Sequence, residues 1–190
     1  AKRGVSVICN PTASHFAFGK AEIRKTLTLE GAKIINGAYL FANLLGNEAG
    51  RIIFDGDAYI AHEGSILAQT PRFSFQDSQV IAHTFDVRGF ANPADDLIQM
   101  GSINHTNSQN ISCEVPSWES DNYVKDEEFA RSIALGLWDY LRKSHSNGFV
   151  ISLSGGADSS AIASLCATAF HLAVKELGWL GVQSRLAYIP

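Results

Sequence analysis

Hydrophobic and polar positions follow two different patterns along this chain, and short apolar runs dominate the first 90 residues. These runs are rich in β-branched and aromatic residues, and turn pairs such as Asp55-Gly56 separate them, which is typical of strands. Residues 5–9 form the first run, which Asn10-Pro11 ends. Further strands are predicted at residues 38–45, 51–54, 58–61, 66–69 and 79–87, and the chain from Tyr59 to Leu67 is predicted to form a hairpin.

One helix interrupts these strands. Ile23, Leu27 and Ile34 recur at near-helical spacing between residues 20 and 36, and they predict the buried side of that helix. The pair Asn36-Gly37 supplies its stop signal.

After Phe90 the regular pattern disappears. Residues 91–121 are polar, with little periodicity, although a short strand is predicted at 111–115. Loops of this length are uncommon inside compact domains. We therefore expect a first domain at residues 1–90, a linker at 91–120 and a second domain at 121–190, the alternative being a long surface loop of a single domain.

A helix–strand–helix–strand order is predicted for the second half. Phe129, Ile133, Leu137 and Leu141 repeat every fourth position and predict the apolar side of a helix that Asp126 begins. A buried strand at 149–153, a tight loop at 154–160, a helix at 161–177 and a strand at 184–189 follow. This order predicts an α/β domain with a parallel sheet.

Composition and charge narrow the function classes. The chain is 46% hydrophobic and 18% charged, as in a cored globular protein, and its net charge of −4 argues against a nucleic-acid surface. No apolar run approaches the length of a membrane span. Cys9, Cys113 and Cys166 form no CxxC pair and the histidines show no metal-ligand spacing, so we expect no disulfide, no metal site and a cytoplasmic location.

The strongest chemical signal is the segment from Ser154 to Ser160, SGGADSS. A predicted strand leads into it and a helix follows, with Asp158 or Ser159 expected at the helix N-cap. Glycines there allow close backbone approach, and free N–H groups with the helix dipole favour phosphate oxygens. The loop is neither GxxxxGK[ST] nor GxGxxG. The alternative is a Ser/Gly turn that only caps a helix.

This loop resembles the SGGxDS loop of ATP pyrophosphatases, enzymes that cleave ATP between the α and β phosphates. Upstream, NPTASHF at residues 10–16, followed by Gly19, Lys20 and Arg24, resembles a segment of nitrilase-type glutaminase domains, as do residues 46–51 and 54–57. These motifs, in this order, are typical of the glutamine-dependent NAD synthetases. The resemblance implies an α/β chain: the C-terminal part of a nitrilase-like αββα sandwich, then the start of a Rossmann-like adenine nucleotide α-hydrolase domain.

The resemblance also implies an activity. The family amidates deamido-NAD to NAD through an adenylate, with ammonia from glutamine hydrolysis, and releases AMP, pyrophosphate and glutamate. ATP with Mg²⁺ is a substrate, no tightly bound cofactor is expected, and a homo-oligomer is. ATP would be bound by Ser152, Leu153, Ser154, Gly155, Gly156, Ala157, Asp158, Ser159 and Ser160.

Glutamine would be contacted by Ser14 and Lys20, the alternative being a turn serine and a solvated lysine. The family's catalytic Glu-Lys-Cys triad would precede residue 1, so the sequence resembles a piece shortened at both ends. Cys9 is expected in a buried strand, Cys113 in the linker and Cys166 in a helix, none as the nucleophile. Alternatives for the activity are another amidating or thiolating SGGxDS enzyme, or a non-catalytic nitrilase-fold scaffold.

Overall fold

The computed structural model describes residues 5–48, 50–85 and 109–190, and its strands lie in the first half of the chain. The elements in order are β1 (Val7–Thr12), α1 (Lys20–Ile35), β2 (Ala38–Asn43), β3 (Leu45–Glu48), β4 (Ile52–Asp55), β5 (Ala58–His62) and β6 (Ser65–Gln69). The short 3₁₀ helix η1 (Ser117–Ser120) and the long helices α2 (Val124–Ser144) and α3 (Ala157–Arg185) follow.

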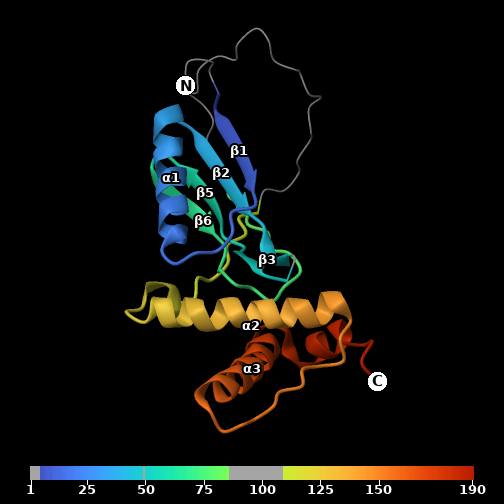
Figure 1. Cartoon of the computed structure of the whole chain (residues 1–190). Coiled ribbons are helices and arrows are strands. Elements are labelled where there is room, and N and C mark those ends of the chain that lie inside the picture. Colours follow the sequence, from blue (N-terminus) through green and yellow to red (C-terminus); the bar gives the residue numbers. More distant parts are fainter. Residues whose placement is uncertain (1–4, 49, 86–108) are drawn as a thin grey trace.

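A four-stranded sheet forms the upper part of the molecule, in the order β1-β2-β5-β6 (Figure 1). Strands β1 and β2 are parallel, with Val7 beside Ala38, and α1 makes the crossover between them and covers one face of the sheet. The other neighbours are antiparallel. A separate ribbon of β3 and β4 packs against α2.

The predicted hairpin is confirmed in β5 and β6. His62 pairs with Ser65, which leaves a two-residue turn of Glu63 and Gly64. Both have positive φ, 48° and 79°, as a type I′ turn requires. The register shifts once, between Ile60 and Ala61.

Helix α1 forms where predicted, but the predicted buried side is wrong. Ile23, Leu27 and Ile34 are 60%, 66% and 71% exposed. The helix instead buries Ala21, Arg24, Thr28 and Ala32. At Gly31 the helix lies so close to the sheet that an added Cβ would stand 2.7 Å from the ring of Tyr39, while Arg24 is buried by its pairing with Asp55 and Asp57.

Asn36 and Gly37 end α1 as expected. Asn36 has φ 50°, in the left-handed region that asparagine tolerates. Its N–H donates to the Lys33 carbonyl, and the Gly37 N–H donates to that of Ala32, at 3.1 Å each. The last carbonyls of the helix are thereby satisfied.

Helices α2 and α3 pack on each other below the sheet and form the main core of the second half (Figure 1). That core is made of Phe75, Ala134, Trp138, Leu141, Ala169, Ala173, Val182 and Leu186. The predicted stripe on α2 is correct for Leu141, which is fully buried, but Phe129 is 52% exposed. The buried side of α2 is rotated from the predicted stripe, because Leu135 and Trp138 are the side chains that enter the two hydrophobic clusters beside this helix.

Neither strand predicted for the second half is present. Residues 149–153 run without pairing to any described strand, and Val150 is fully exposed. Residues 184 and 185 end α3, and a turn follows. Val182 and Leu186, four residues apart, pack on α2 as helical neighbours, with the Leu186 N–H bonded to the Val182 carbonyl. The apolar run is therefore helical rather than extended.

The region between the halves is partly structured. The predicted strands at 79–87 and 111–115 reduce to one bridge between Ala82 and Ile111, with residues 86 and 87 outside the described part. Residues 91–108 of the predicted linker also lie outside it. Its later part forms η1, which buries Trp118 at 7% exposure.

Candidate functional site

Ser14 and Lys20 lie on one loop, at the carboxyl ends of the parallel strands β1 and β2. Ser14 follows β1, and Lys20 begins α1 after Gly19, which has φ 74°. The Lys20 ammonium donates to the carbonyl of His15 at 3.0 Å. The structure therefore brings the two predicted glutamine contacts together, at the sheet edge where open α/β sheets bind ligands.

A buried polar cluster supports this loop from below. Arg24 donates through Nε to Asp57 at 2.8 Å and through Nη2 to Asp55, and both carboxylates are fully buried. Arg24 Nη1 lies 3.5 Å from Ser14 Oγ. Asn43 Nδ2 donates to Asp55 and to Asp57 at 3.1 Å each.

Burial controls the ionisation of this cluster. Desolvation raises the pKa of Asp55, the charge of Asp57 raises it further, and Arg24 opposes both. Desolvation and the neighbouring Asp57 also raise the pKa of Tyr59, so its phenol stays protonated. The hydrogen bonds of this cluster tie the Ser14 loop to Arg24 of α1.

The phosphate-loop candidate forms a solvent-exposed turn at the N-terminus of α3. Gly155 has φ 81°, whereas Gly156 has φ −80° and ψ 167° and is the helix N-cap. The expected cap of Asp158 or Ser159 is thus wrong, and Asp158 lies in the first helical turn. Negative charge there still suits the helix dipole.

Hydroxyl groups surround the Gly156 backbone. Ser159 and Ser160 donate to the Gly156 carbonyl at 3.2 and 2.9 Å, and Ser154 Oγ lies 3.3 Å from Ser159 Oγ. Ser152, Leu153, Ala157 and Asp158 are exposed around the same turn. Free N–H groups of the first helical turn and the three serine hydroxyls can together donate to an anion.

Arg72, which follows β6, ties the first half to the helices. Its Nε donates to Glu119 of η1 at 2.9 Å and its Nη1 donates to Glu128 of α2 at 2.5 Å. Its guanidinium also stacks 5.1 Å from the centre of the Trp118 ring. Burial would lower the pKa of Arg72, but the hydrogen bonds that it donates to Glu128 and Glu119 outweigh burial and raise the pKa.

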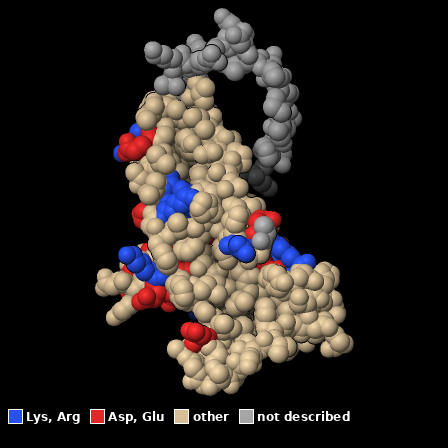
Figure 2. Space-filling model, viewed as in Figure 1, with Lys and Arg blue, Asp and Glu red and all other residues tan. Residues whose placement is uncertain are grey.

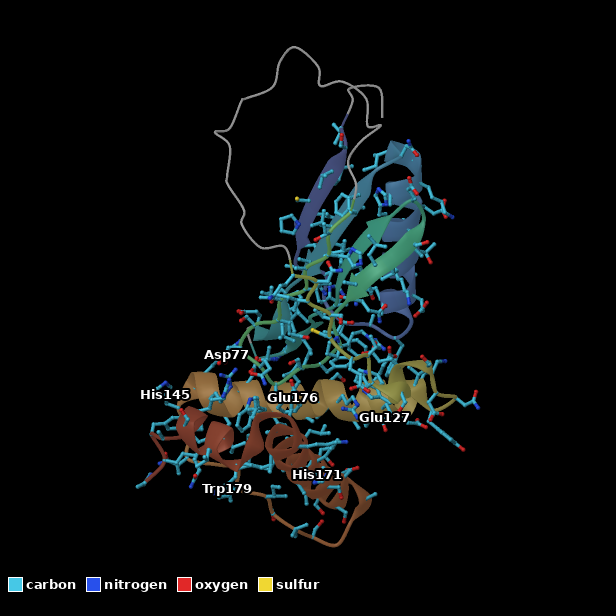
Figure 3. The ribbon with its side chains drawn as sticks, turned by 180° about the vertical axis from the view of Figure 1, so that it is seen from behind. Asp77, Glu127, His145, His171, Glu176 and Trp179 are labelled. Carbon is cyan, nitrogen blue, oxygen red and sulfur yellow. The ribbon has the colours of Figure 1, made fainter. Side chains whose placement is uncertain are left out.

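The loop that follows β6 and carries Arg72 also contacts helix α3. Glu176 accepts hydrogen bonds from the Ser74 hydroxyl and, at 3.0 Å, from the Phe75 N–H. Asp77 accepts from Arg142 of α2 at 2.8 Å and from Arg185 of α3 at 2.9 Å. Figure 3 shows Asp77 and Glu176 where this loop meets the helices.

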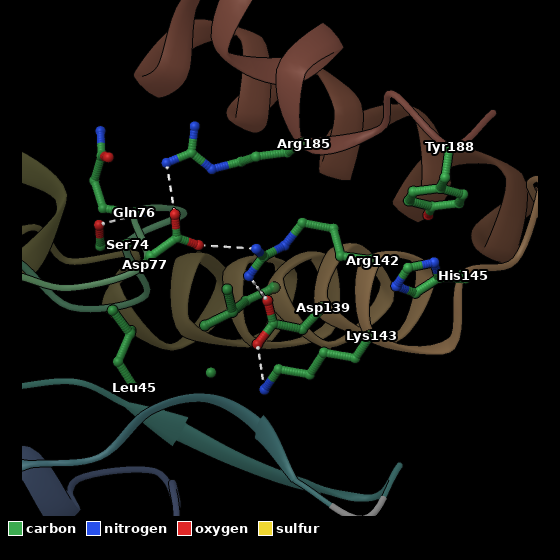
Figure 4. A pocket seen from close by; sticks show the side chains of 12 residues that line it. Leu45, Ser74, Gln76, Asp77, Asp139, Arg142, Lys143, His145, Arg185 and Tyr188 are labelled. Atoms are coloured by element: carbon green, nitrogen blue, oxygen red, sulfur yellow. Dashed lines mark hydrogen bonds and ion pairs between the residues drawn. The ribbon is translucent and has the colours of Figure 1, made fainter. Parts of the chain in front are cut away.

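Two cavities lie at this junction. One of about 400 Å³ contains the Asp77 ion pairs, with Lys143, His145 and Tyr188 on its wall (Figure 4). The other, of about 690 Å³, is lined by Trp118, Arg131 and Lys175 among others. The charged groups in the first cavity form ion pairs with each other. These pairs connect the loop after β6 to α2 and α3, so we do not take this cavity as a preformed ligand site.

The cysteines lie on three separate elements. Cys9, in β1, is exposed, so the expectation of a buried strand position is wrong there. Cys113 Sγ lies 3.9 Å from the Val80 carbonyl. Cys166 of α3 is half-buried, and burial raises the pKa of its thiol. Their predicted lack of a nucleophilic role stays a prediction.

Two further properties concern metals and membranes. Within residues 5–48, 50–85 and 109–190, no group of three His, Cys, Asp or Glu side chains could hold a metal ion. Helix α3 is long and apolar enough to meet a length-and-composition criterion for a membrane span. Gly178, with φ 70° and ψ 165°, breaks it into two helices, and Glu176 accepts a hydrogen bond from Ser74 in the loop after β6.

Sequence comparison links this arrangement to known proteins. The NAD synthase family model matches residues 129–184, which span most of α2 and α3. Glutamine-dependent NAD(+) synthetases of Arabidopsis thaliana and Drosophila melanogaster are 32% and 33% identical over 93% and 85% of this chain. A solved glutamine-dependent NAD(+) synthetase from Cytophaga hutchinsonii is 38% identical over 98% of the chain, with a TM-score of 0.72.

The chain belongs to the glutamine-dependent NAD(+) synthetase family. It spans 26% and 22% of the length of the two curated relatives. The synthetase from Acinetobacter baumannii, solved in complex with adenosine diphosphate, is 21% identical and shares the fold, with a TM-score of 0.63 over 88% of this chain.

Several residues of the candidate sites were missed from the sequence. Asn43 lies inside the strand predicted at 38–45 and gave no chemical signal, and Asp55 and Asp57 were noted only as part of the motif at residues 54–57 and, for Asp55, of a turn pair. Arg72, Glu128 and Glu176 connect parts of the chain 47 or more residues apart. Such contacts depend on tertiary structure.

Proposed function

We propose that the protein carrying this chain amidates deamido-NAD to NAD, using ATP and ammonia released from glutamine. The observation that carries the proposal is the exposed SGGADSS turn at the start of α3, on a chain of the glutamine-dependent NAD(+) synthetase family. Glutamine is hydrolysed to glutamate and ammonia. ATP adenylates the nicotinate carboxylate and releases pyrophosphate, and ammonia then displaces AMP.

The phosphate loop takes the pyrophosphate end of MgATP. Backbone N–H groups of the first turn of α3 and the hydroxyls of Ser154, Ser159 and Ser160 donate to its oxygens. Ser152, Leu153, Gly155, Gly156 and Ala157 shape the approach, and Asp158 organises the site. The adenosine diphosphate in the related A. baumannii structure supports a nucleotide at this enzyme type. Mg²⁺ arrives with ATP and neutralises charge on the leaving pyrophosphate.

Ser14 and Lys20 hold glutamine in this proposal. The Ser14 hydroxyl donates or accepts a hydrogen bond, and the Lys20 ammonium pairs with the substrate carboxylate. The Lys20 ammonium lies near Ser14, because its Nζ is 3.0 Å from the carbonyl oxygen of His15, the residue after Ser14. The hydrolysis itself belongs to the family's Glu-Lys-Cys triad, and none of Cys9, Cys113 and Cys166 serves as its thiol.

The domain division belongs to the same proposal. Residues 1–90 are the C-terminal portion of a nitrilase-like glutaminase domain, 91–120 a linker, and 121–190 the N-terminal portion of a Rossmann-like synthetase domain. The protein acts in the cytoplasm as a homo-oligomer.

The test is NAD formation by the full-length protein with two nitrogen donors. We expect NAD from deamido-NAD with either glutamine or ammonium, and ATP–pyrophosphate exchange that requires deamido-NAD. Exchange that requires another acceptor would point to a different SGGxDS enzyme. Nucleotide binding without exchange would point to a non-catalytic scaffold.

A further inference from the structure

Asn43, the last residue of β2, holds the backbone of Ser14 at two points. Its Oδ1 accepts a hydrogen bond from the Ser14 N–H at 2.8 Å, and its Nδ2 donates to the Ser14 carbonyl at 2.9 Å. An amide side chain can make both bonds because it carries a donor and an acceptor. The position of Ser14 is thus fixed by a side chain 29 residues away in sequence.

The orientation of that amide is itself fixed. Asn43 Nδ2 faces the carboxylates of Asp55 and Asp57 at 3.1 Å each. Ionised carboxylates only accept hydrogen bonds, so the amide must present its NH₂ group to them and its oxygen to Ser14. Arg24, 4% exposed, fixes both carboxylates in turn.

We propose that Asn43 is a positioning residue of the glutamine site, which sets the place of the Ser14 hydroxyl and, through the adjoining peptide, of Lys20. Lys20 is coupled because its ammonium bonds to the carbonyl of His15, the next residue after Ser14. Loss of the Asn43 clamp would displace both side chains together. This inference rests on the proposed function, in which Ser14 and Lys20 contact glutamine.

The first test is Asn43→Ala in the full-length protein. The KM for glutamine should rise roughly tenfold, the effect of one or two lost buried hydrogen bonds, while NAD formation from ammonium stays at the wild-type rate. Asn10→Ala is the matched control, since Asn10 is another half-buried asparagine of the same sheet and donates to the Tyr39 hydroxyl at 3.0 Å, away from Ser14. Its KM should stay within about twofold of wild type.

Asn43→Asp separates positioning from a loss of folding. It keeps an oxygen for the Ser14 N–H, but when ionised it cannot donate to the Ser14 carbonyl. It also adds a charge beside Asp55 and Asp57, where the facing cations are Arg24 and Arg72 and the phenol of Tyr59 also borders Asp57. Protonation restores a donor, so its KM for glutamine should fall toward the wild-type value as pH is lowered, unlike that of Asn43→Ala.

The outcomes are distinct. A wild-type KM in Asn43→Ala overturns the proposal, and so does an equal loss of ammonium-dependent and glutamine-dependent NAD formation. If Asn43→Ala does not fold, a flat pH response of Asn43→Asp relative to wild type overturns it. If the wild-type protein makes no NAD from ammonium, the proposed function fails instead.

Discussion

The two glycines of the phosphate loop have different conformational needs. Gly155, with φ 81°, occupies the left-handed region, where an L-residue costs about 1–2 kcal/mol. Gly156, with φ −80° and ψ 167°, has backbone angles open to any residue, and a Cβ there would meet Ser154 Oγ at 3.5 Å, an ordinary contact. Glycine at 156 is therefore not required by the fold, which leaves ligand approach as its reason.

Gly156→Val should abolish MgATP binding while leaving stability unchanged, because the added methyl groups stand over the N–H groups of the first helical turn. Gly155→Ala should lower the free energy of unfolding by about 1 kcal/mol and weaken binding less. Titration calorimetry with MgATP and urea unfolding measure the two effects. Wild-type affinity in Gly156→Val would mean that phosphates bind elsewhere.

Arg24→Met should destabilise the protein by about 3–5 kcal/mol at pH 7, because it leaves Asp55 and Asp57 buried without their cation. A raised pKa in the folded state means that Asp55 supports folding at low pH and loses that contribution as pH rises through its folded pKa. Removing Arg24 raises this pKa further. The destabilisation should therefore shrink as pH is lowered from 7 to 5.

Urea unfolding at the two pH values measures this effect. Lys33→Met is the control, since Lys33 pairs with Glu30 on the same helix at 54% exposure of both side chains. It should change stability by less than about 0.5 kcal/mol at either pH. A penalty for Arg24→Met that grows on acidification would contradict the expected sign.

At the scale of elements, α3 shows how one glycine redirects a helix. Gly178 adopts φ 70° and ψ 165°, a conformation essentially confined to glycine, and after it the chain resumes a helix that buries Val182 and Leu186. The second segment can pack on α2 only because the helix turns at this residue. Arg185 then reaches Asp77.

Gly178→Ala should lower the free energy of unfolding by about 1–3 kcal/mol, the cost of forcing a side chain into this region of backbone space. Gly181→Ala, three residues on and inside the second helical segment, is the control. Its Cβ would lie 3.1 Å from Leu177 Cβ, a tight contact that offsets the gain in helix propensity. Thermal melting compares the two, and equal effects would contradict the kink as the cause.

At the scale of the whole molecule, ion pairs and hydrogen bonds to charged groups join the sheet to the helices. Arg72 lies between Glu119 and Glu128, Glu176 takes two donors from residues 74 and 75, and Asp77 takes two arginines. Arg72, Ser74, Phe75 and Asp77, which make these contacts, all lie on the one loop that follows β6. The upper and lower parts of the molecule are therefore expected to unfold together.

Arg72→Lys should cost about 3–5 kcal/mol, nearly as much as Arg72→Met, because one ammonium cannot reproduce the fork that reaches both glutamates. Circular dichroism in urea measures it. Two separate transitions in either variant, against one in wild type, would show that Arg72 couples the parts. A lysine variant as stable as wild type would contradict the argument.

The sequence predicted the local features and missed what tertiary contacts decide. The hairpin at Glu63-Gly64 and the end of α1 at Asn36-Gly37 depend on a few adjacent residues, so the pattern sufficed. The buried side of α1 was wrong because Arg24 is buried by two distant carboxylates, which no periodicity reveals. In the candidate sites, Ser14, Lys20 and the SGGADSS turn came from motifs, whereas Asn43 required the fold.

The unpaired segment at 149–153 has a consequence for handling the protein. Its sequence, FVISL, is β-prone and uncharged, Val150 and Leu153 are 104% and 67% exposed, and Figure 2 shows few charges on the lower part of the molecule. An exposed, uncharged and β-prone segment of this kind can serve as a template for intermolecular sheet growth. The isolated chain should aggregate with concentration, and Val150→Lys should act as a gatekeeper that suppresses it. Light scattering should show no such protection from Leu27→Lys, which removes an apolar side chain that is 66% exposed from α1, away from this segment.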